Sequence, residues 1–483
     1  MKQAIDVGAV HRHIDAHFDE RVEMLRRYVR QPSVSTEGSG MRECAALVAA
    51  HYRELGCQEV EIVETETFPA VWAHYDAGAP RTIVNYNMYD VRSVGNRAAW
   101  THDPFGADVE ARGEAPAVLY GRGACVPKGP DVAWLSALAS IRAVHGDLPV
   151  NVAFLAEGDE ILGSPSYAGL IERYAGRIAG ADGCVYLRAG QTADGELPLV
   201  LGYKAFLTIE LRASGRRWGR GPVDGPAHSA TASIVDGPAW RLARALATLV
   251  EEDGRIAIAG WPDGARMPEP GAADRALVDA LLERFRGQPW ADVIPGLAGT
   301  GVRAFSHDRR GDGVLLAYLF GSSLNIQGLA AGYTGPGTRT YTVPESASAL
   351  LDARLFTARE PDELVADLRA HLDDRGFEDV ELTVRSAYPA CRTDPAADLV
   401  RAFLAAARRA GGRPVVWPVQ GYGGPWAILA RRFGMPLVFA TGIGHGGNVG
   451  LPDEYLVLDG GERLPGLREM QRFCVDFVQE FAG

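Results

Sequence analysis

Acidic side chains stand where two buried strands are expected to end. Asp90 follows one short apolar run, and Asp159 and Glu160 follow another. Arg188 stands in the corresponding place after a third run. Because burial and like-charged neighbours both raise the pKa of a carboxyl group, such acids can act as general acids or bases near neutral pH. The alternative is structural: Asp90 and Glu160 pair with Arg188 and Lys128 and hold the strand ends together.

Lysine is rare in this chain, which has 49 basic residues but only Lys2, Lys128 and Lys204 as lysines. Lysine and arginine are not interchangeable at tight sites, because the ammonium group is compact and the guanidinium group is planar. We therefore expect Lys128 and Lys204 to serve a site that needs a compact cation. The alternative is that their positions have no special meaning.

Cys125 lies three residues before Lys128. A thiolate beside Lys128 and Arg188 would have a lowered pKa and could act as a nucleophile. The alternative is a small buried residue. The six cysteines, at 44, 57, 125, 184, 391 and 474, show no paired spacing, which favours reduced thiols in a cytoplasmic protein.

Four short apolar runs, at 82–86, 150–156, 183–187 and 436–440, are predicted as buried strands of a parallel sheet. Helical patterns at 41–55 and 132–145 alternate with them. This alternation predicts an α/β sheet with helices on both faces. Since ligand sites in such sheets lie beyond the carboxyl ends of the strands, we expect the polar clusters there to meet in one cleft.

A second unit is expected to begin near residue 205. Its predicted elements are a strand at 206–213, a helix at 237–252, strands at 255–259 and 340–356, and a helix at 361–374. This order favours a small α+β sandwich inserted into the first domain. The predicted domains are 1–204, an insert at 205–345 whose end is uncertain up to about 385, and a return at 386–483.

The negative net charge argues against nucleic acid or an anionic membrane as a binding partner. The chain has 483 residues and a formal net charge of -12, so it lacks the basic surface that nucleic acid or an anionic membrane requires. Charged residues interrupt the N-terminal segment, so we expect neither a signal peptide nor a membrane span there.

Six segments, in this order, resemble one family of zinc peptidases. They are Trp-Thr-His-Asp-Pro-Phe at 100–105, Tyr-Gly-Arg-Gly-Ala at 120–124 with Lys-Gly-Pro at 128–130, Glu-Gly-Asp-Glu at 157–160 with Gly-Ser at 163–164, Ala-His-Ser at 227–229, Asp-Ala-Arg-Leu at 352–355 and Pro-Asp-Glu-Tyr at 452–455. The family includes aminoacylase, carnosinase, carboxypeptidase G and succinyl-diaminopimelate desuccinylase. The resemblance implies an α/β fold, with a mostly parallel catalytic sheet and an inserted α+β sandwich that serves as lid and dimerisation domain.

The same resemblance implies two zinc ions held by two His, two terminal acids and a bridging Asp, with a Glu as general base. Glu160 matches that base. The five ligand positions carry other residues, namely Met88, Val126, Ile161, Arg188 and Gly450. We therefore expect no metal and no other cofactor. A rearranged single-metal site built from His445, His74 or Asp159 is the alternative.

The residues that recognise a carboxylate in the family are better retained. Arg354 matches the arginine that binds the substrate carboxylate, and Asn325 fits a lid position. Tyr422, Gly423 and Gly424 resemble a loop that completes this pocket, with Pro425 where the family has Ser. His228 matches a histidine that dipeptidases supply across a dimer interface; the alternative is a structural histidine in a turn.

Taken together, these features predict a metal-independent enzyme that acts on an amino-acid- or peptide-like carboxylate substrate. The expected chemistry is acid–base catalysis by Glu160, Asp90, Lys128, Arg188 and His228, with a Cys125 nucleophile as one variant of it, while Arg354, Asn325, Lys204 and Asp159 bind substrate. A homodimer is expected by resemblance, and a role in specialised biosynthesis by analogy. The alternatives are a non-catalytic binding protein and a metal-dependent peptidase with rearranged ligands.

Overall fold

The computed structural model describes residues 5–192, 194–265, 268–337, 341–461 and 464–483. The chain forms two compact units. Unit 1 contains Met1–Leu201, Arg392–Trp417 and Ile428–Gly483, and unit 2 contains Gly202–Cys391 and Pro418–Ala427. The short segment 418–427 therefore belongs to unit 2, although the chain on both sides of it belongs to unit 1.

A six-stranded mixed sheet forms the centre of unit 1, in the order β1-β2-β6-β3-β7-β18. Its strands are β1 (Glu59–Val63), β2 (Ala70–Tyr75), β3 (Thr82–Met88), β6 (Asn151–Glu157), β7 (Gly183–Leu187) and β18 (Leu437–Thr441). β6, β3, β7 and β18 are parallel, and they confirm the four predicted strands. β1 and β2 add an antiparallel edge that was not predicted.

The four parallel strands end at the same edge of the sheet, because parallel neighbours share one direction. Asp90 follows β3, Asp159 and Glu160 follow β6, and Arg188 follows β7. These strands are rich in β-branched and aromatic residues and are buried along most of their length, as expected for strands covered on both faces.

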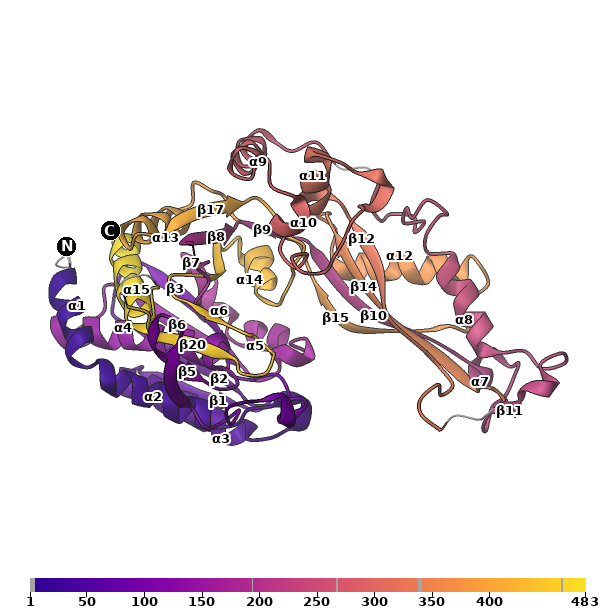
Figure 1. Ribbon diagram of the computed structural model, residues 1–483, viewed down its shortest axis with the longest axis horizontal. Helices are drawn as coiled ribbons and strands as arrows, with labels where there is room; N and C mark the ends of the chain where they lie inside the picture. Colours follow the sequence, from indigo (N-terminus) through magenta and orange to yellow (C-terminus); the bar gives the residue numbers. More distant parts are fainter. Residues whose placement is uncertain (1–4, 193, 266–267, 338–340, 462–463) are drawn as a thin grey trace. The chain divides into compact units, whose positions relative to one another are not determined.

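Helices pack around this sheet, with α15 in contact with both α4 and α13 (Figure 1). The helices of unit 1 are α1 (Val7–Ala16), α2 (Phe18–Arg30), α3 (Met41–Leu55), α4 (Gly129–His145), α5 (Tyr167–Arg173), α6 (Ala175–Ile178), α13 (Asp398–Arg409) and α15 (Leu467–Ala482). α14 (Trp426–Phe433) begins in unit 2 and ends in unit 1. Among the described residues, no helix has both the length and the apolar character needed to cross a membrane.

Smaller elements complete unit 1. A four-stranded antiparallel sheet contains β4 (Asp108–Arg112), β5 (Ala115–Tyr120), β19 (Gly446–Gly447) and β20 (Tyr455–Asp459), and β8 (Glu196–Val200) pairs in parallel with β17 (Arg413–Trp417). The short helical turns are η1 (Ser35–Glu37), η2 (Arg97–Ala99), η3 (Ala124–Lys128) and η4 (Glu160–Leu162). The pairing of β5 with β20 places the start of the 121–128 loop beside residue 454.

A buried ion pair joins these two loops. Arg122 donates to the Glu454 carboxylate at 2.7 Å, and both side chains are almost fully buried. The other carboxylate oxygen accepts the backbone N–H groups of Cys125 and Val126, both at 3.2 Å. Glu454 therefore fixes the backbone of the loop that follows β5.

Unit 2 is built on a β-α-β-β-α-β pattern. Its sheet has the order β12-β14-β10-β15, formed by β10 (Ala205–Ser214), β12 (Ser323–Ala331), β14 (Ser346–Leu355) and β15 (Glu381–Tyr388). The helices α8 (Pro238–Ala247) and α12 (Pro361–Asp373) share one apolar core with this sheet (Figure 1). The remaining elements are β9 (Gly202–Tyr203), α7 (Gly215–Trp218), β11 (Ala227–His228), η5 (Ser229–Thr231), α9 (Ala272–Arg284), α10 (Trp290–Val293), η6 (Ser306–Asp308), α11 (Asp312–Phe320), β13 (Thr342–Val343) and β16 (Cys391–Arg392).

Two predictions for unit 2 need correction. The strand predicted at 255–259 is not a strand, and the second strand of the pattern is β12 instead. The strand predicted at 340–356 is divided into β13 and β14, since Pro344 lies between them; residue 340 lies outside the described residues.

The buried ion pair leads to a stability prediction. Arg122→Met leaves the Glu454 carboxylate buried without its cation, so we expect a loss of about 3–5 kcal/mol in the free energy of unfolding, measured by urea denaturation. Arg42→Met removes an exposed ion pair with Glu64 and should leave this free energy unchanged. Equal effects of the two substitutions would contradict the importance of the buried pair.

Candidate functional site

The Asp90 carboxylate is fully buried and holds the turn that carries Glu160. It accepts hydrogen bonds from the Ser35 hydroxyl at 2.7 Å and from the Ile161 N–H at 2.9 Å. Burial raises the pKa of Asp90 to about 6, although the two hydrogen bonds oppose this rise. Among the described residues it forms no ion pair with Arg188 or Lys128, so Asp90 acts here as a positioning residue.

Glu160 opens the short turn η4 and is half-buried. Burial raises the pKa of its carboxyl group to about 7, the neighbouring Asp90 adds to the rise, and Arg92 opposes it. A carboxyl group that ionises near neutral pH is well matched to general-base catalysis. The structure therefore gives Glu160 the environment that acid–base chemistry requires.

Two further acids next to Glu160 are buried. Asp159 accepts a hydrogen bond from the Thr67 hydroxyl. Glu157, the last residue of β6, accepts one from the Tyr86 hydroxyl at 2.6 Å, and burial raises its pKa well above the usual range. Glu157 was not singled out from the sequence, although its place at a strand end was a usable signal. Burial therefore disfavours the charged form of this carboxyl group.

The Arg188 guanidinium forms no ion pair within the part of the chain that the structure describes. Its backbone N–H donates to the Thr441 carbonyl at 3.0 Å, but its side-chain Nε is buried and has no hydrogen-bond partner among the described residues. Its charge acts on Tyr186 and Cys125, where it opposes the rise in pKa that burial causes. Among the described residues, the Arg188 charge therefore acts on Tyr186 and Cys125 and is not neutralised in an ion pair.

The predicted thiolate at Cys125 is not supported. Its side chain is buried and packs so closely on Gly446 that a Cβ there would lie 2.5 Å from the Sγ. Burial and the Glu454 carboxylate raise the pKa of Cys125 to about 12, and Arg188 only partly offsets them. The thiol is therefore protonated at neutral pH, which fits a small packing residue rather than a nucleophile.

Lys128 and Lys204 serve helix ends rather than the strand-end acids. The Lys128 ammonium donates to the carbonyls of Tyr28 and Gln31, at 3.0 and 2.6 Å, where α2 ends. The Lys204 ammonium donates to those of Tyr318 and Gly321, at 2.7 and 2.6 Å, where α11 ends. The last carbonyls of a helix lack partners within the helix and favour a cation.

This shared geometry explains why both positions hold lysine. A compact, buried ammonium group can reach two carbonyls of one helix end, and burial lowers the pKa of both lysines, that of Lys204 to about 7. The expectation that they need a compact cation is consistent with this geometry. Their predicted catalytic and substrate-binding roles find no contact to support them.

Arg92 is a site residue that was missed in the sequence. It is exposed, and its side chain lies against Gly450, where an added Cβ would be 2.9 Å from both the Cδ and an Nη of Arg92. Its charge lowers the pKa of Glu160. The signal was its place two residues after Asp90, but only the fold brings it to Gly450.

The candidate ligands for a single rearranged metal do not converge. Nδ1 of His445 lies 2.8 Å from the Gln191 carbonyl, and His74 lies on β2 beside Arg177. Among the described residues, no three His, Cys, Asp or Glu side chains gather in a group able to hold a metal ion.

In unit 2, the guanidinium of Arg354 is already engaged. It makes two hydrogen bonds to Asp352 at 3.0 and 2.9 Å, one to the Gly421 carbonyl at 3.2 Å, and lies 3.7 Å above the Phe206 ring. The guanidinium N–H groups of Arg354 that would bind a substrate carboxylate are therefore already bound to the Asp352 carboxylate. The predicted role of Arg354 would require this ion pair to open.

The other predicted binding residues of unit 2 are spread over two segments. Asn325 is exposed on β12, opposite Asp352 in the sheet. Tyr422 is half exposed, whereas Gly423 and Gly424 lie so close to Phe206 and Trp426 that a Cβ at either would clash. The two glycines therefore permit close packing, and their predicted role in binding stays a prediction.

His228 is exposed at the end of β11. Its Nδ1 accepts the N–H of Ala230 at 3.2 Å, so in the neutral ring the proton lies on Nε2. An exposed Nε2–H is a hydrogen-bond donor that a second molecule can reach.

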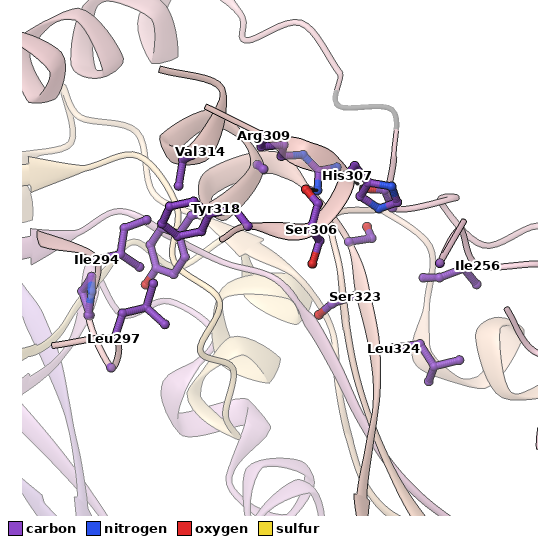
Figure 2. Close-up of a pocket in the computed structure, with 18 residues that line it drawn as sticks. Ile256, Ile294, Leu297, Ser306, His307, Arg309, Val314, Tyr318, Ser323 and Leu324 are labelled. Carbon is purple, nitrogen blue, oxygen red and sulfur yellow. Dashed lines mark hydrogen bonds between the residues drawn. The ribbon is translucent and has the colours of Figure 1, made fainter. Parts of the chain in front are cut away.

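Unit 2 also contains a cavity of about 420 Å³ (Figure 2). Ile294, Leu297 and Tyr318 lie toward one end, and Ser306 and His307 toward the other. None of the predicted site residues lines it. With an apolar wall and a few hydroxyl groups it can hold a small molecule, but it offers no carboxyl group for acid–base chemistry.

Comparisons with known proteins agree with the fold. The sequence matches Peptidase family M20/M25/M40 over residues 89–464. It is 26% identical to Beta-Ala-His dipeptidase of Rattus norvegicus over 383 residues, which cover 75% of this chain and 72% of the relative. It is 32% identical to succinyl-diaminopimelate desuccinylase of Stenotrophomonas maltophilia over 201 residues, covering 40% and 49% of the two chains.

Solved structures of peptidases also resemble this chain in fold. An M20 family metallo-carboxypeptidase from Sulfolobus solfataricus superposes with a TM-score of 0.80 at 26% identity, covering 96% of this chain and 99% of the other. Human carnosine dipeptidase 1 superposes with a TM-score of 0.73 at 22% identity, covering 99% of each chain. With a family match over more than half of its length, the chain belongs to Peptidase family M20/M25/M40.

Proposed function

We propose that this protein is a metal-independent enzyme that acts on an amino-acid- or peptide-like carboxylate substrate by acid–base chemistry, with Glu160 as the base. The observation that carries the proposal is the set of residues at the five family ligand positions. Those residues are Met88, Val126, Ile161, Arg188 and Gly450.

The residues at these positions do not fit a dinuclear zinc site. Val126, Ile161 and Gly450 have no side-chain donor atom, and the thioether of Met88 is a soft ligand unsuited to a site of hard oxygen and nitrogen donors. The guanidinium of Arg92 lies where a side chain at Gly450 would begin. Restoring a histidine there would displace Arg92.

Arg188 also makes the charge of these positions unsuitable for zinc, in addition to their lack of donor atoms. Its guanidinium carries a positive charge. A single positive charge about 4 Å away is repelled by about 4 kcal/mol at an effective dielectric constant near 20, and a dication is repelled more strongly. No step of the proposed reaction therefore passes through a metal ion.

The substrate class rests on the relatives. Beta-Ala-His dipeptidase, Cys-Gly metallodipeptidase and a carboxypeptidase are named for peptide substrates that carry a carboxylate. Glu160 can accept a proton from such a substrate or from water, while Asp90 holds its turn in place. The protonated thiol of Cys125 is not part of the reaction.

A base with a pKa near 7 gives a defined pH profile. Glu160 must be ionised to accept a proton, so kcat/KM on a panel of dipeptides and N-acyl amino acids should rise with pH and level off above about 7. Glu160→Gln should lower kcat by about 10²–10⁴-fold, and a zinc chelator should leave the rate unchanged. Glu66→Gln, at an exposed acid, is the matched control.

Turnover that needs added zinc would refute the metal-independent reaction. Full activity in Glu160→Gln would refute the base assignment. Substrate binding without any turnover would favour the alternative of a non-catalytic binding protein.

A homodimer formed through unit 2 is also part of the proposal. β12 is the edge strand of its sheet, and its side chains Ile326 and Leu329 are exposed by 49% and 64%. Trp240 on α8 is exposed by 73%. An exposed edge strand with apolar side chains is a template for pairing with another chain. Six free cysteines favour a reducing compartment such as the cytoplasm.

The dimer predicts that His228 acts on the partner subunit. Mixed Glu160→Gln and His228→Ala chains should regain about one quarter of the wild-type rate, because half of the dimers are mixed and each has one complete site. Leu329→Lys on β12 should yield monomers in light scattering, whereas Val384→Lys on the opposite edge strand β15 should not. A fully active monomer would contradict the proposal.

A further inference from the structure

Two arginines of unit 1, Arg92 and Arg188, have no anionic partner. Neither guanidinium forms an ion pair or donates a hydrogen bond to any described residue. Other arginines of unit 1, such as Arg81, Arg122 and Arg177, pair with carboxylates. Some other described arginines of unit 1, such as Arg21 and Arg53, also form no ion pair, so what distinguishes Arg92 and Arg188 is their place beyond the ends of β3 and β7.

Both arginines lie at, or against, positions that the resemblance matches to metal ligands of the family. Arg188 stands at the end of β7, where the family has a terminal acid. Arg92 covers Gly450, where the family has a histidine. The absence of a Cβ at Gly450 is what allows the Arg92 side chain to lie there, since an added Cβ would be 2.9 Å from its Cδ.

Arg92 follows β3 and Arg188 follows β7, and these two strands are parallel neighbours, so both residues lie at the same edge of the sheet. Arg92 acts electrostatically on Glu160, and both Glu160 and Arg188 act on the Tyr186 hydroxyl. Hydrogen bonds from the backbone of Gly450 and Cys125 to one carboxylate connect the two loops nearby. The Gly450 N–H donates to the Glu454 carboxylate at 3.5 Å, and the same carboxylate accepts the N–H of Cys125. The charge of Arg188 opposes the rise in the pKa of the Cys125 thiol.

We propose that Arg92 and Arg188 together form a carboxylate-binding site in unit 1, at the position where metal-bearing relatives hold their cations. This inference rests on the proposed function and names the group that recognises the substrate. Guanidinium groups bind carboxylates through paired N–H donors, and such charge-assisted bonds are among the strongest in proteins. The site therefore takes an anion where the family takes a dication.

This assignment moves carboxylate recognition from unit 2 to unit 1. The guanidinium of Arg354 already holds Asp352 with two hydrogen bonds, whereas those of Arg92 and Arg188 are free of such pairs. A carboxylate bound by Arg92 and Arg188 lies beside Glu160, the proposed base. The charge of ionised Glu160 weakens anion binding, so the bound carboxylate and the base are coupled.

Isothermal titration of the full chain with succinate tests the site without requiring turnover. We expect wild-type protein to bind succinate, more tightly at pH 6 than at pH 8, because Glu160 is mostly neutral at the lower pH. Arg92→Gln and Arg188→Gln should each weaken binding by at least about tenfold. Arg42→Gln, which removes an exposed arginine of the same unit, should bind as the wild type does.

Circular dichroism should show that each variant is folded, and Arg92→Glu offers a second test at an exposed position where folding is least at risk. Its reversed charge should abolish binding. Unchanged succinate binding in Arg92→Glu or Arg188→Gln would overturn the site. Binding of inorganic phosphate with exclusion of succinate would overturn its assignment to a carboxylate.

Failure of this inference and failure of the proposed function are distinguishable. If succinate binds through both arginines but no substrate is turned over, the carboxylate-binding site is supported and the proposed catalytic function is refuted. If turnover depends on Glu160 while succinate binding is unchanged in both arginine variants, the proposed catalytic function is supported and the carboxylate-binding site is refuted.

Discussion

The buried ion pair between Arg122 and Glu454 is the constraint on which the architecture of unit 1 depends at this edge. Glu454 binds Arg122 on one side and the backbone N–H groups of Cys125 and Val126 on the other. It thereby holds the loop after β5 against the loop before β20. Because both charges are buried, neither can be lost singly without leaving an uncompensated ion. This pair gives the two loops a fixed geometry relative to each other.

In the proposed function, the electrostatics of the site around these loops differ from those of a dinuclear zinc site. Ligand positions carry uncharged side chains or a cation, and the acids that remain are buried enough to raise their pKa, Asp90 to about 6 and Glu160 to about 7. In the proposed site, Arg92 and Arg188 supply the positive charge. The arrangement keeps an acid able to exchange a proton beside groups able to hold an anion, which are the two requirements of acid–base chemistry on a carboxylate substrate.

The sequence predicted the four parallel strands and two of the helices of unit 1 because their signals are local. β7 and α3 match the predicted ranges, since apolar runs and helix periodicity depend on neighbouring residues. β12 was missed because an exposed edge strand lacks the alternation of a buried one. Site chemistry depends on distant partners. The helix ends bound by Lys128 and Lys204, the burial of Cys125 and the contact of Arg92 with Gly450 all join residues far apart in the chain.

The absence of zinc from the reaction is the central claim, and metal content tests it most directly. Protein expressed in medium supplemented with zinc, and purified without chelator, should contain far less than one zinc ion per chain by elemental analysis, and Gly450→His alone should not restore binding because Arg188 and the other positions remain. Two tightly bound zinc ions per chain in the wild-type protein would contradict the account.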